Sequence, residues 1–441
     1  MSKVKLYALL AALGCMLGTA SSATAEGFGL YEYGARGLGL GGAMMARKPD
    51  ASAVAFNPAL LTRLPGIHAM AGVTAVSPTG KMDWQEKDGT RGTTELRDSV
   101  WGIPHGYYTH QINEDWFFGI GEFTRYGLGF EYPHDWPGRF NIYQVSLISG
   151  SLNPVMAWKA TEQLSLAAGV EIVYVNLDLK KRIKREFSGT GGSFMEVDSN
   201  IQNADAWGVG MNVAAHYQFN DQWAVGMQYR SQVRVHAYGD AEFTYLGIKG
   251  PAAGNAALNA MALAGYNQAF KDGTAHATVI LPDSFSAGIA WTPIPELSIE
   301  AGAIWTRWST FRSLNINLPD KMAPNNKSHN SKHWDDVWRI NVGVEYDVLD
   351  WLTLRAGYVW DQSPMTEKFE DYLVPTGDRD IYSAGVGFRW DAWTLDLAYA
   401  FINPKSRSYK NDQVDGGTWT VKSKTRDAYT QLLSVSLGYT F

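Results

Sequence analysis

The end of the chain alternates strictly between two kinds of side chain, and this pattern constrains the fold more than any other feature. One set is apolar or aromatic and the other is small or polar: Leu433, Val435, Leu437, Tyr439 and Phe441 against Ser434, Ser436, Gly438 and Thr440. Successive side chains of a strand point to opposite sides, so one face suits lipid and the other a lumen. The pattern recurs in 393–401, 338–346, 207–217 and 297–305.

No segment after residue 25 reaches the run of about 18 uncharged apolar residues that a spanning helix needs. A membrane protein without such helices must satisfy its backbone hydrogen bonds in a closed barrel. Aromatic residues make up 13% of the chain and charged residues 19%, and the rings recur at strand ends, where a membrane interface favours them. A soluble sandwich would also alternate, but it would not need an aromatic at so many strand ends.

About 14 alternating segments can be counted, and an even number suits a bacterial barrel. They are 66–78, 100–111, 116–127, 144–159, 164–186, 204–219, 223–245, 275–292, 297–315, 336–348, 352–361, 380–390, 393–404 and 427–441. Short turns alternate with long links, which predicts periplasmic turns and extracellular loops. The expected fold is therefore all-β, a 14-stranded antiparallel transmembrane barrel over 66–441 in the outer membrane.

The first 25 residues have the form of a secretory signal peptide. Lys3 and Lys5 precede an apolar stretch over 6–17, and residues 23–25 read Ala-Thr-Ala, a small-x-small cleavage pattern. A membrane anchor would need about 20 apolar residues. Cys15, the only cysteine, lies inside the signal, so we expect no disulfide or thiol chemistry in the mature protein. The formal charge of −6 argues against a nucleic-acid partner.

Residues 26–65 do not alternate and are rich in glycine, alanine and apolar side chains. Their apolar content favours burial, so we expect a partly helical hatch that plugs the barrel. Gly37, Gly39 and Gly42 match a dinucleotide-binding spacing, but no strand precedes them. We therefore expect these glycines to allow close packing against the barrel wall.

The hatch carries three short motifs, and further motifs occur later in the chain. These are Gly27-Phe28-Gly29-Leu30-Tyr31-Glu32, Gly37-Leu38-Gly39 and Asn57-Pro58-Ala59, followed by 116–128, 281–285, 306–311 and 361–364. Together they resemble the long-chain fatty-acid transporter family of outer-membrane proteins, which also takes up toluene and related aromatics. The resemblance covers essentially the whole mature chain. It implies a hatch-filled barrel, an extracellular apolar groove that captures ligand, and a kinked third strand that opens sideways into the bilayer.

The resemblance implies three groups of functional residues. The hatch and gate would comprise Gly27, Phe28, Leu30, Asn57, Pro58 and Ala59, with Asn57 to Ala59 holding the hatch against the third strand. The third-strand kink would comprise Gly119, Gly121, Phe123 and Tyr126. The capture surface would comprise Leu128, Trp136, Leu258, Met261, Tyr266 and Phe270. The last four share a helical period, which fits either a loop helix packed on the barrel rim or an apolar shelf for the ligand. Without the resemblance, the strand glycines would merely admit neighbouring rings, and the Asn-Pro-Ala turn would merely end a helix.

Passive uptake of hydrophobic small molecules with lateral release is the predicted function, without cofactor, metal or enzyme activity. A polar porin is the first alternative. A barrel hydrolase using Asp98, His105 or His216 is the second, although no serine or histidine motif singles out such a site. By motif alignment, Asn176 and Asn315 occupy lumen positions that are basic in the fatty-acid branch, which leaves a neutral ligand open.

The expected partners are the hydrophobic ligand, outer-membrane lipid, lipopolysaccharide and the barrel-assembly machinery, which would recognise the terminal Phe441. The basic run over 180–185 would attract lipopolysaccharide phosphates or steer a carboxylate. His329 and His333 have metal-compatible spacing but lack a clear carboxylate partner, so we expect a solvated loop. A closed barrel needs no second subunit, so we expect a monomer.

Overall fold

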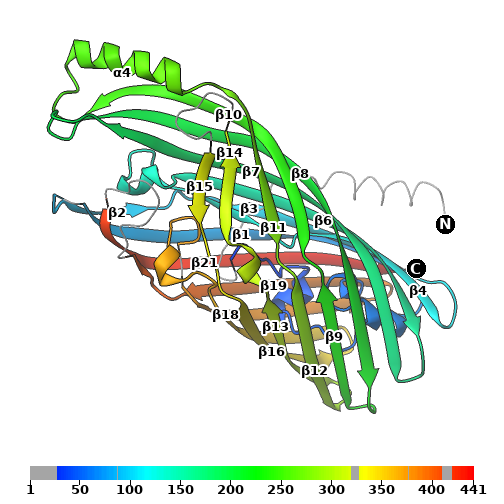
Figure 1. Cartoon of the computed structure of the whole chain (residues 1–441). Helices are drawn as coiled ribbons and strands as arrows, with labels where there is room; N and C mark the ends of the chain where they lie inside the picture. The colour runs from blue at the N-terminus through cyan, green and yellow to red at the C-terminus, as the bar shows by residue number, and fades with distance from the viewer. Residues whose placement is uncertain (1–26, 87, 319–326, 376, 410–419) are drawn as a thin grey trace.

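The computed structural model describes residues 27–86, 88–318, 327–375, 377–409 and 420–441, so the predicted signal peptide lies outside the described residues. One sheet closes on itself into a barrel (Figure 1). Closure comes from the antiparallel pairing of the first strand, β1 (Ile67–Glu86), with the last, β21 (Thr420–Thr440). The 21 strand segments form the 14 antiparallel strands of the predicted barrel. Each of these 14 wall strands, whether continuous or made of two segments, is called a stave below.

Four staves are interrupted and the others are continuous. Between β1 and β21 the order is β3 (Trp101–Gln111), β4 (Trp116–Phe123) with β5 (Leu128–Glu131), β6 (Gln144–Lys159), β7 (Leu164–Glu186), β8 (Phe194–Gln218), β9 (Trp223–Arg230) with β10 (Val233–Lys249), β12 (Ser284–Ile294) with β11 (Gly273–Leu281), β13 (Leu297–Thr306) with β14 (Ser313–Asn317), β16 (Val337–Leu349), β17 (Leu352–Asp361), β18 (Arg379–Trp390) and β19 (Trp393–Pro404). Three short segments, β2 (Arg91–Glu95), β15 (Lys327–Ser331) and β20 (Ser408–Tyr409), pair with β1, β14 and β21.

Strand ends differ from the sequence expectation in two ways. The predicted links 79–98 and 187–203 contain paired strand, because β1 extends to Glu86 and β8 begins at Phe194. Conversely, four predicted continuous strands are interrupted, near residues 124, 231, 282 and 307. Pro282 has no N–H to donate to a ladder, and a 3-10 turn, η3 (Trp308–Thr310), follows Arg307. Alternation therefore identified the staves but not their breaks.

The two faces of the barrel wall have the predicted chemistry. Leu433 is 63% exposed, whereas the neighbouring Ser434 is 1% exposed and bonds to Thr74 inside. Aromatic pairs cap the outer face, such as Trp116 with Trp158, whose ring centroids lie 6.0 Å apart. Rings at this level suit the boundary between hydrocarbon and headgroups.

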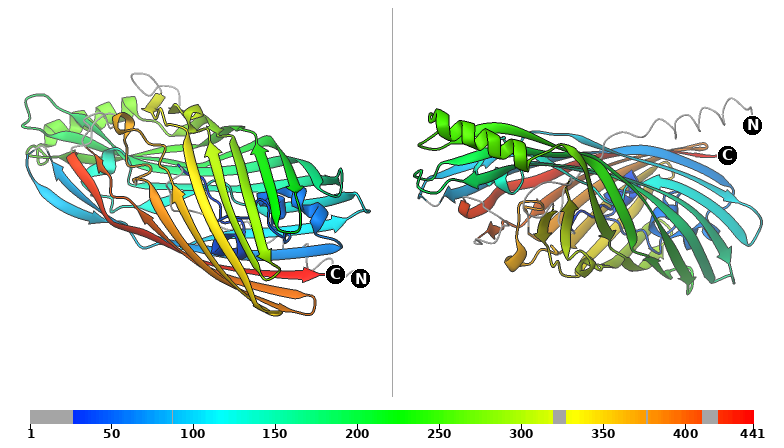
Figure 2. Two further views of the ribbon diagram at one scale, coloured as in Figure 1. Left: turned by 90° about the horizontal axis from the view of Figure 1, so that it is seen from below. Right: turned by 45° about the horizontal axis from the view of Figure 1, so that its top comes forward.

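Residues before β1 fold into short turns inside the barrel, as Figure 2 shows in blue. They are α2 (Ala35–Gly39), α3 (Ala53–Phe56) and η1 (Pro58–Arg63), and almost every side chain is buried. The longest helix of the described residues, α4 (Ala256–Ala269), projects from the β10–β11 connection at the loop end of the molecule (Figures 1 and 2). None of the helices in the described ranges has the length and apolar character to cross a membrane.

Candidate functional site

The third stave changes partners along its length. Its lower part, β4, pairs with β3 as far as Glu122 opposite Gly106, and with β6 as far as Phe123 opposite Ser151. Its upper part, β5, pairs with β6, and 101–105 of β3 pair with β1. Among the described strands, nothing joins 101–105 of β3 to β5. The sheet is therefore interrupted on one side of the barrel, between these two strands.

Defined contacts bound this interruption. Below it lies the Gly106–Glu122 pair. Above it, the Arg97 amide donates to the Glu131 carbonyl at 2.8 Å, and the Arg97 and Glu131 side chains form an ion pair. A cavity of about 60 Å³ adjoins β5 and is lined by residues including Leu96, Leu128 and Phe130. Apolar side chains thus lie beside the interrupted part of the wall.

The N-terminal residues of the hatch pair with the kinked segment between β4 and β5. The Leu30 amide donates to the Arg125 carbonyl at 2.8 Å, and the Gly127 amide donates to the Phe28 carbonyl at 2.9 Å. Gly29 and Tyr126 form the bridge between these two bonds. The predicted gate residues Phe28 and Leu30 therefore contact the predicted kink directly, through backbone hydrogen bonds.

Gly27 allows the chain to enter this position. Its φ of +59° is a left-handed value that suits glycine. A Cβ at Gly27 would lie 2.6 Å from the rings of both Trp308 and Trp334. Any other residue would be strained at this backbone conformation, and its Cβ would clash with these two rings.

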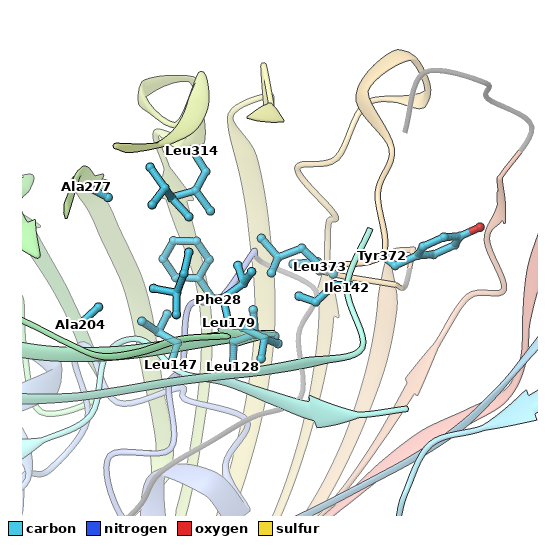
Figure 3. Close-up of a cluster of buried hydrophobic side chains, with 14 of the residues drawn as sticks. Phe28, Leu128, Ile142, Leu147, Leu179, Ala204, Ala277, Leu314, Tyr372 and Leu373 are labelled. Carbon is cyan, nitrogen blue, oxygen red and sulfur yellow. The ribbon is translucent and has the colours of Figure 1, made fainter. Parts of the chain in front are cut away.

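Phe28 reaches from the hatch into a cluster of buried apolar side chains above it. Its ring centroid lies 4.6 Å from that of Trp308, 5.6 Å from Phe311 and 5.9 Å from Trp334. Figure 3 shows Phe28 among Leu128, Leu147, Leu179, Leu314 and Leu373, which come from strands and loops far apart in sequence. These residues form one buried cluster with Trp136, Trp308, Phe311 and Trp334, called the apolar cluster below. It joins the loops, the kinked stave and the hatch.

The predicted capture surface divides between this cluster and the outside. Leu128 and Trp136 are buried members of the apolar cluster rather than exposed surface. On and after α4, Leu258, Tyr266 and Phe270 pack against the cluster. Met261 is 57% exposed and is not among the side chains packed against the cluster. The helix period identified the helix but not which of its side chains face inward.

The Asn57-Pro58-Ala59 turn is held mainly by a strand other than the third. The Asn57 side chain donates to Met45 O at 2.7 Å and to Ala215 O of β8 at 3.2 Å, and it accepts from Ala59 N. Contact with the third stave comes instead from Val54 and Leu61, on either side of this turn. The turn therefore holds the hatch against β8 and also links two parts of the hatch to each other.

The expected role of Gly119 and Gly121 as the bend is wrong, because both lie in regularly paired β4. A Cβ at Gly119 would lie 2.7 Å from Leu61 and Val54, and one at Gly121 would lie 2.6 Å from Tyr107. The break begins only after Phe123, a buried residue that contacts the Tyr33 ring of the hatch. These glycines make room for the hatch and a ring.

Buried carboxylates that sequence reasoning missed hold the hatch in place. Glu300 of β13 accepts the backbone N–H groups of Met45, Ala46 and Arg47 at 2.6, 3.0 and 3.0 Å, and pairs with the Arg47 guanidinium at 3.5 Å. The Arg36 guanidinium donates to Glu345 of β16 through Nε and Nη2, at 2.8 and 2.7 Å. Burial disfavours the charged form of Arg36, but Glu345 outweighs this and raises its pKa. The available signal was a charged residue at a lumen position of an apolar strand.

Two asparagines predicted to face the lumen point outward. Val175 and Leu314 are buried neighbours, so alternation places Asn176 and Asn315 on the opposite face. Asn176 bonds to Asp205 there at 2.9 Å. The motif alignment was wrong by one face at these positions. The lumen instead carries Arg125, Arg230 and Arg339.

The residues considered for catalysis or metal binding are dispersed. His105 bonds to Ser436 and His216 to Ala46, each at a separate point where the hatch meets the wall, and Asp98 contacts neither histidine. His329 bonds to Asn315 and Ser331 in the β14–β15 hairpin. Within the described residues, no three histidine, cysteine or acidic side chains form a metal-type group.

The basic run is partly paired. The Arg182 guanidinium lies 2.7 Å from the Asp198 carboxylate of β8, and Lys184 pairs with Glu186. Contact of this run with lipopolysaccharide stays a prediction.

A closed antiparallel barrel with an apolar, ring-capped outer face and its own N-terminal segment in the lumen is a plugged outer-membrane channel protein. A family model described as outer membrane protein transport protein (OMPP1/FadL/TodX) matches residues 16–441, and the chain belongs to this family. Members of this family are transporters, and this protein is located in the outer membrane.

Curated relatives and solved structures agree with this assignment. Outer membrane protein P1 of Haemophilus influenzae is 26% identical, with 97% of each chain covered. The long-chain fatty acid transport protein of Escherichia coli K12 is 23% identical over 88% of this chain and 90% of its own. A Pseudomonas aeruginosa FadL homologue superposes with a TM-score of 0.79, at 21% identity, covering 96% of this chain and all of its own. For the Pseudomonas putida toluene transporter TodX the TM-score is 0.72, at 19% identity, 95% and 100% coverage. At these identities the structures establish the fold.

Proposed function

We propose that this protein takes up hydrophobic small molecules passively across the outer membrane. The observation that carries the proposal is the position of Phe28, which joins the apolar cluster under the loops to the interrupted third stave. An apolar solute gains about 0.8 kcal/mol for each CH₂ that leaves water, so it needs a sequence of apolar sites rather than a water-filled pore. The names of the relatives, which specify long-chain fatty acid and toluene, support this class of ligand.

Release would occur sideways, between β3 and β5. The wall lacks a ladder there, and the Phe28–Leu30 segment occupies the kink through two backbone hydrogen bonds. Withdrawal of this segment would free the kinked residues 124–127 on their inner side. The ligand would then pass from the apolar cluster to membrane lipid without crossing the charged contacts that hold the hatch below.

The alternatives have less support. A polar porin needs an open aqueous lumen, whereas here the lumen is occupied by buried hatch residues. A hydrolase needs its acid, base and nucleophile together, and the histidines and aspartate considered for that role contact different parts of the molecule. The remaining partners expected from the sequence, which are lipid, lipopolysaccharide and the assembly machinery, belong to the same proposal.

Purified full-length protein should give no steady ion current in a planar bilayer, because the hatch occupies the lumen. The same protein, expressed in cells lacking their own transporters of this family, should accelerate entry of a labelled apolar compound and not of a labelled sugar of similar mass. A large, steady current together with sugar entry would establish the porin alternative instead.

A further inference from the structure

Glu122 places an acidic side chain on the outer face of the wall, directly below the interruption between β3 and β5. It forms the last β3–β4 pair, opposite Gly106, and on its other side it lies opposite Leu152 of β6. The next residue, Phe123, is fully buried, so alternation directs Glu122 outward, as it does Leu152, which is 42% exposed. The carboxyl oxygen lies on that face too, because a Cβ on Gly150 of β6 would be 3.6 Å from Glu122 Oε1.

The carboxyl group lies at the depth of the hydrocarbon. Trp116, one of the rings that cap the outer face, is six residues earlier on the same strand. Six residues of strand span roughly 20 Å, which is roughly 15 Å of height at a strand tilt of about 40°. The apolar band of a barrel is about 25 Å tall, so Glu122 lies within it. The outward residues between Trp116 and Glu122 are the apolar Phe118 and Ile120.

The contacts of the described residues do not account for this carboxyl group. Its oxygens form neither a hydrogen bond nor an ion pair with any residue in the described ranges. Gly106, Gly150 and Leu152, which flank it on the outer face, offer no polar side chain. A charged side chain on the lipid face destabilises a barrel, and ionisable residues at membrane depth mark the pathways of substrates. The unmet hydrogen-bonding capacity of Glu122 therefore points to a ligand.

We propose that Glu122 binds the polar group of a ligand that leaves sideways through the interruption, and that it favours apolar compounds carrying a hydroxyl group. A hydroxyl group loses its hydrogen bonds to water when it enters lipid, and the carboxyl group supplies a replacement at that step. An ionised carboxyl group only accepts hydrogen bonds, which favours a hydroxyl group over a carboxylate. A side chain at position 150 would contact the carboxyl oxygen, so Gly150 keeps this oxygen accessible.

This inference rests on the proposed uptake with lateral release. It adds the class of ligand, a neutral hydrophobic compound with a hydroxyl group, and the residue that selects it.

Two compounds that differ by one hydroxyl group test the inference in cells lacking their own transporters of this family. The unaltered protein should accelerate entry of both 4-methylphenol and toluene. Glu122→Leu should lower the protein-dependent entry of 4-methylphenol about tenfold, since one hydrogen bond to a charged group corresponds to about tenfold or more. Toluene entry should stay unchanged, which also shows that the barrel is folded. Unchanged entry of 4-methylphenol, or an equal loss for both compounds, would overturn the inference. If the unaltered protein accelerates neither compound, the proposed uptake function itself fails.

Two further variants identify the chemistry and the place. Glu122→Gln keeps a hydrogen-bonding side chain of the same size and should retain the entry of 4-methylphenol. A loss as large as that in Glu122→Leu would overturn hydrogen bonding as the basis. Gln431→Leu removes a polar side chain from the outer face of β21, where Gln431 accepts from the Tyr399 hydroxyl at 3.1 Å, away from the interruption. It should leave the entry of both compounds unchanged, and a loss of 4-methylphenol entry equal to that in Glu122→Leu would overturn the location.

Discussion

Glu300→Ala is expected to unseat the hatch and turn the closed barrel into an ion-conducting pore. The substitution leaves the Arg47 guanidinium buried without its carboxylate and removes the acceptor of three backbone N–H groups. Breaking a buried ion pair by removing one partner costs about 3–5 kcal/mol. That energy shifts the ratio of seated to unseated hatch by roughly 100-fold or more. Planar-bilayer recording should show steady current where the unaltered protein shows none.

The matched control for this variant is Glu296→Ala. Glu296 is an exposed acidic residue in the turn before β13 and changes the charge of the same hairpin without contacting the hatch. Heat-dependent gel migration should show a folded barrel in both variants, because the strand pairing of β13 is untouched. A folded Glu300→Ala protein that conducts no ion current would show that the remaining contacts are enough to hold the hatch in place.

A disulfide between positions 29 and 126 is expected to abolish uptake of a hydrophobic compound, and a reductant should restore it. Gly29 and Tyr126 lie opposite each other, flanked by the bonds from Leu30 to Arg125 and from Gly127 to Phe28. This is a non-hydrogen-bonded antiparallel pair, for which the Cα separation is about 4.5 Å, within the range of a disulfide. The only natural cysteine, Cys15, lies in the predicted signal peptide, so the introduced pair has no competing thiol after processing.

The crosslink tests the gate rather than the fold. The doubly substituted protein, Gly29→Cys with Tyr126→Cys, should take up the compound when reduced and should not when oxidised. Uptake by each single variant should be the same with and without the oxidant. Crosslinking can be followed by gel shift in the same cells. Undiminished uptake by fully crosslinked protein would mean that Phe28–Leu30 need not leave the kink.

Sequence reasoning succeeded where the physical signal is local. Alternation identified the lipid and lumen faces because a strand reverses its side chains at every residue, and burial at Ser434 and Ser436 confirms this. It failed where the outcome depends on distant partners. Gly119 looks the same in sequence whether it bends a strand or receives Leu61. The break after Phe123 depends on a segment almost a hundred residues earlier in the chain.

The charged contacts were missed for a related reason. Glu300 and Glu345 stand at lumen positions, which sequence alternation could identify, but alternation does not show whether a lumen position meets water or protein. The hatch covers these sites and supplies Arg36 and Arg47 as partners, while Arg355 of β17 also pairs with Glu345. The position of Asn176 shows the opposite error, in which a motif alignment outweighed the two-residue period of the strand.

The pairing of β1 with β21 also has a consequence for how the molecule is made. These are the first and last strands, so the cylinder is sealed by the contact with the longest separation along the chain, and contacts of that kind form late. The hatch precedes β1 and is enclosed on all sides once this seam zips. The strand that the hatch runs directly into is thus half of the closing seam. Completion of the wall and placement of the segment that fills the lumen are therefore covalently linked at one point of the barrel.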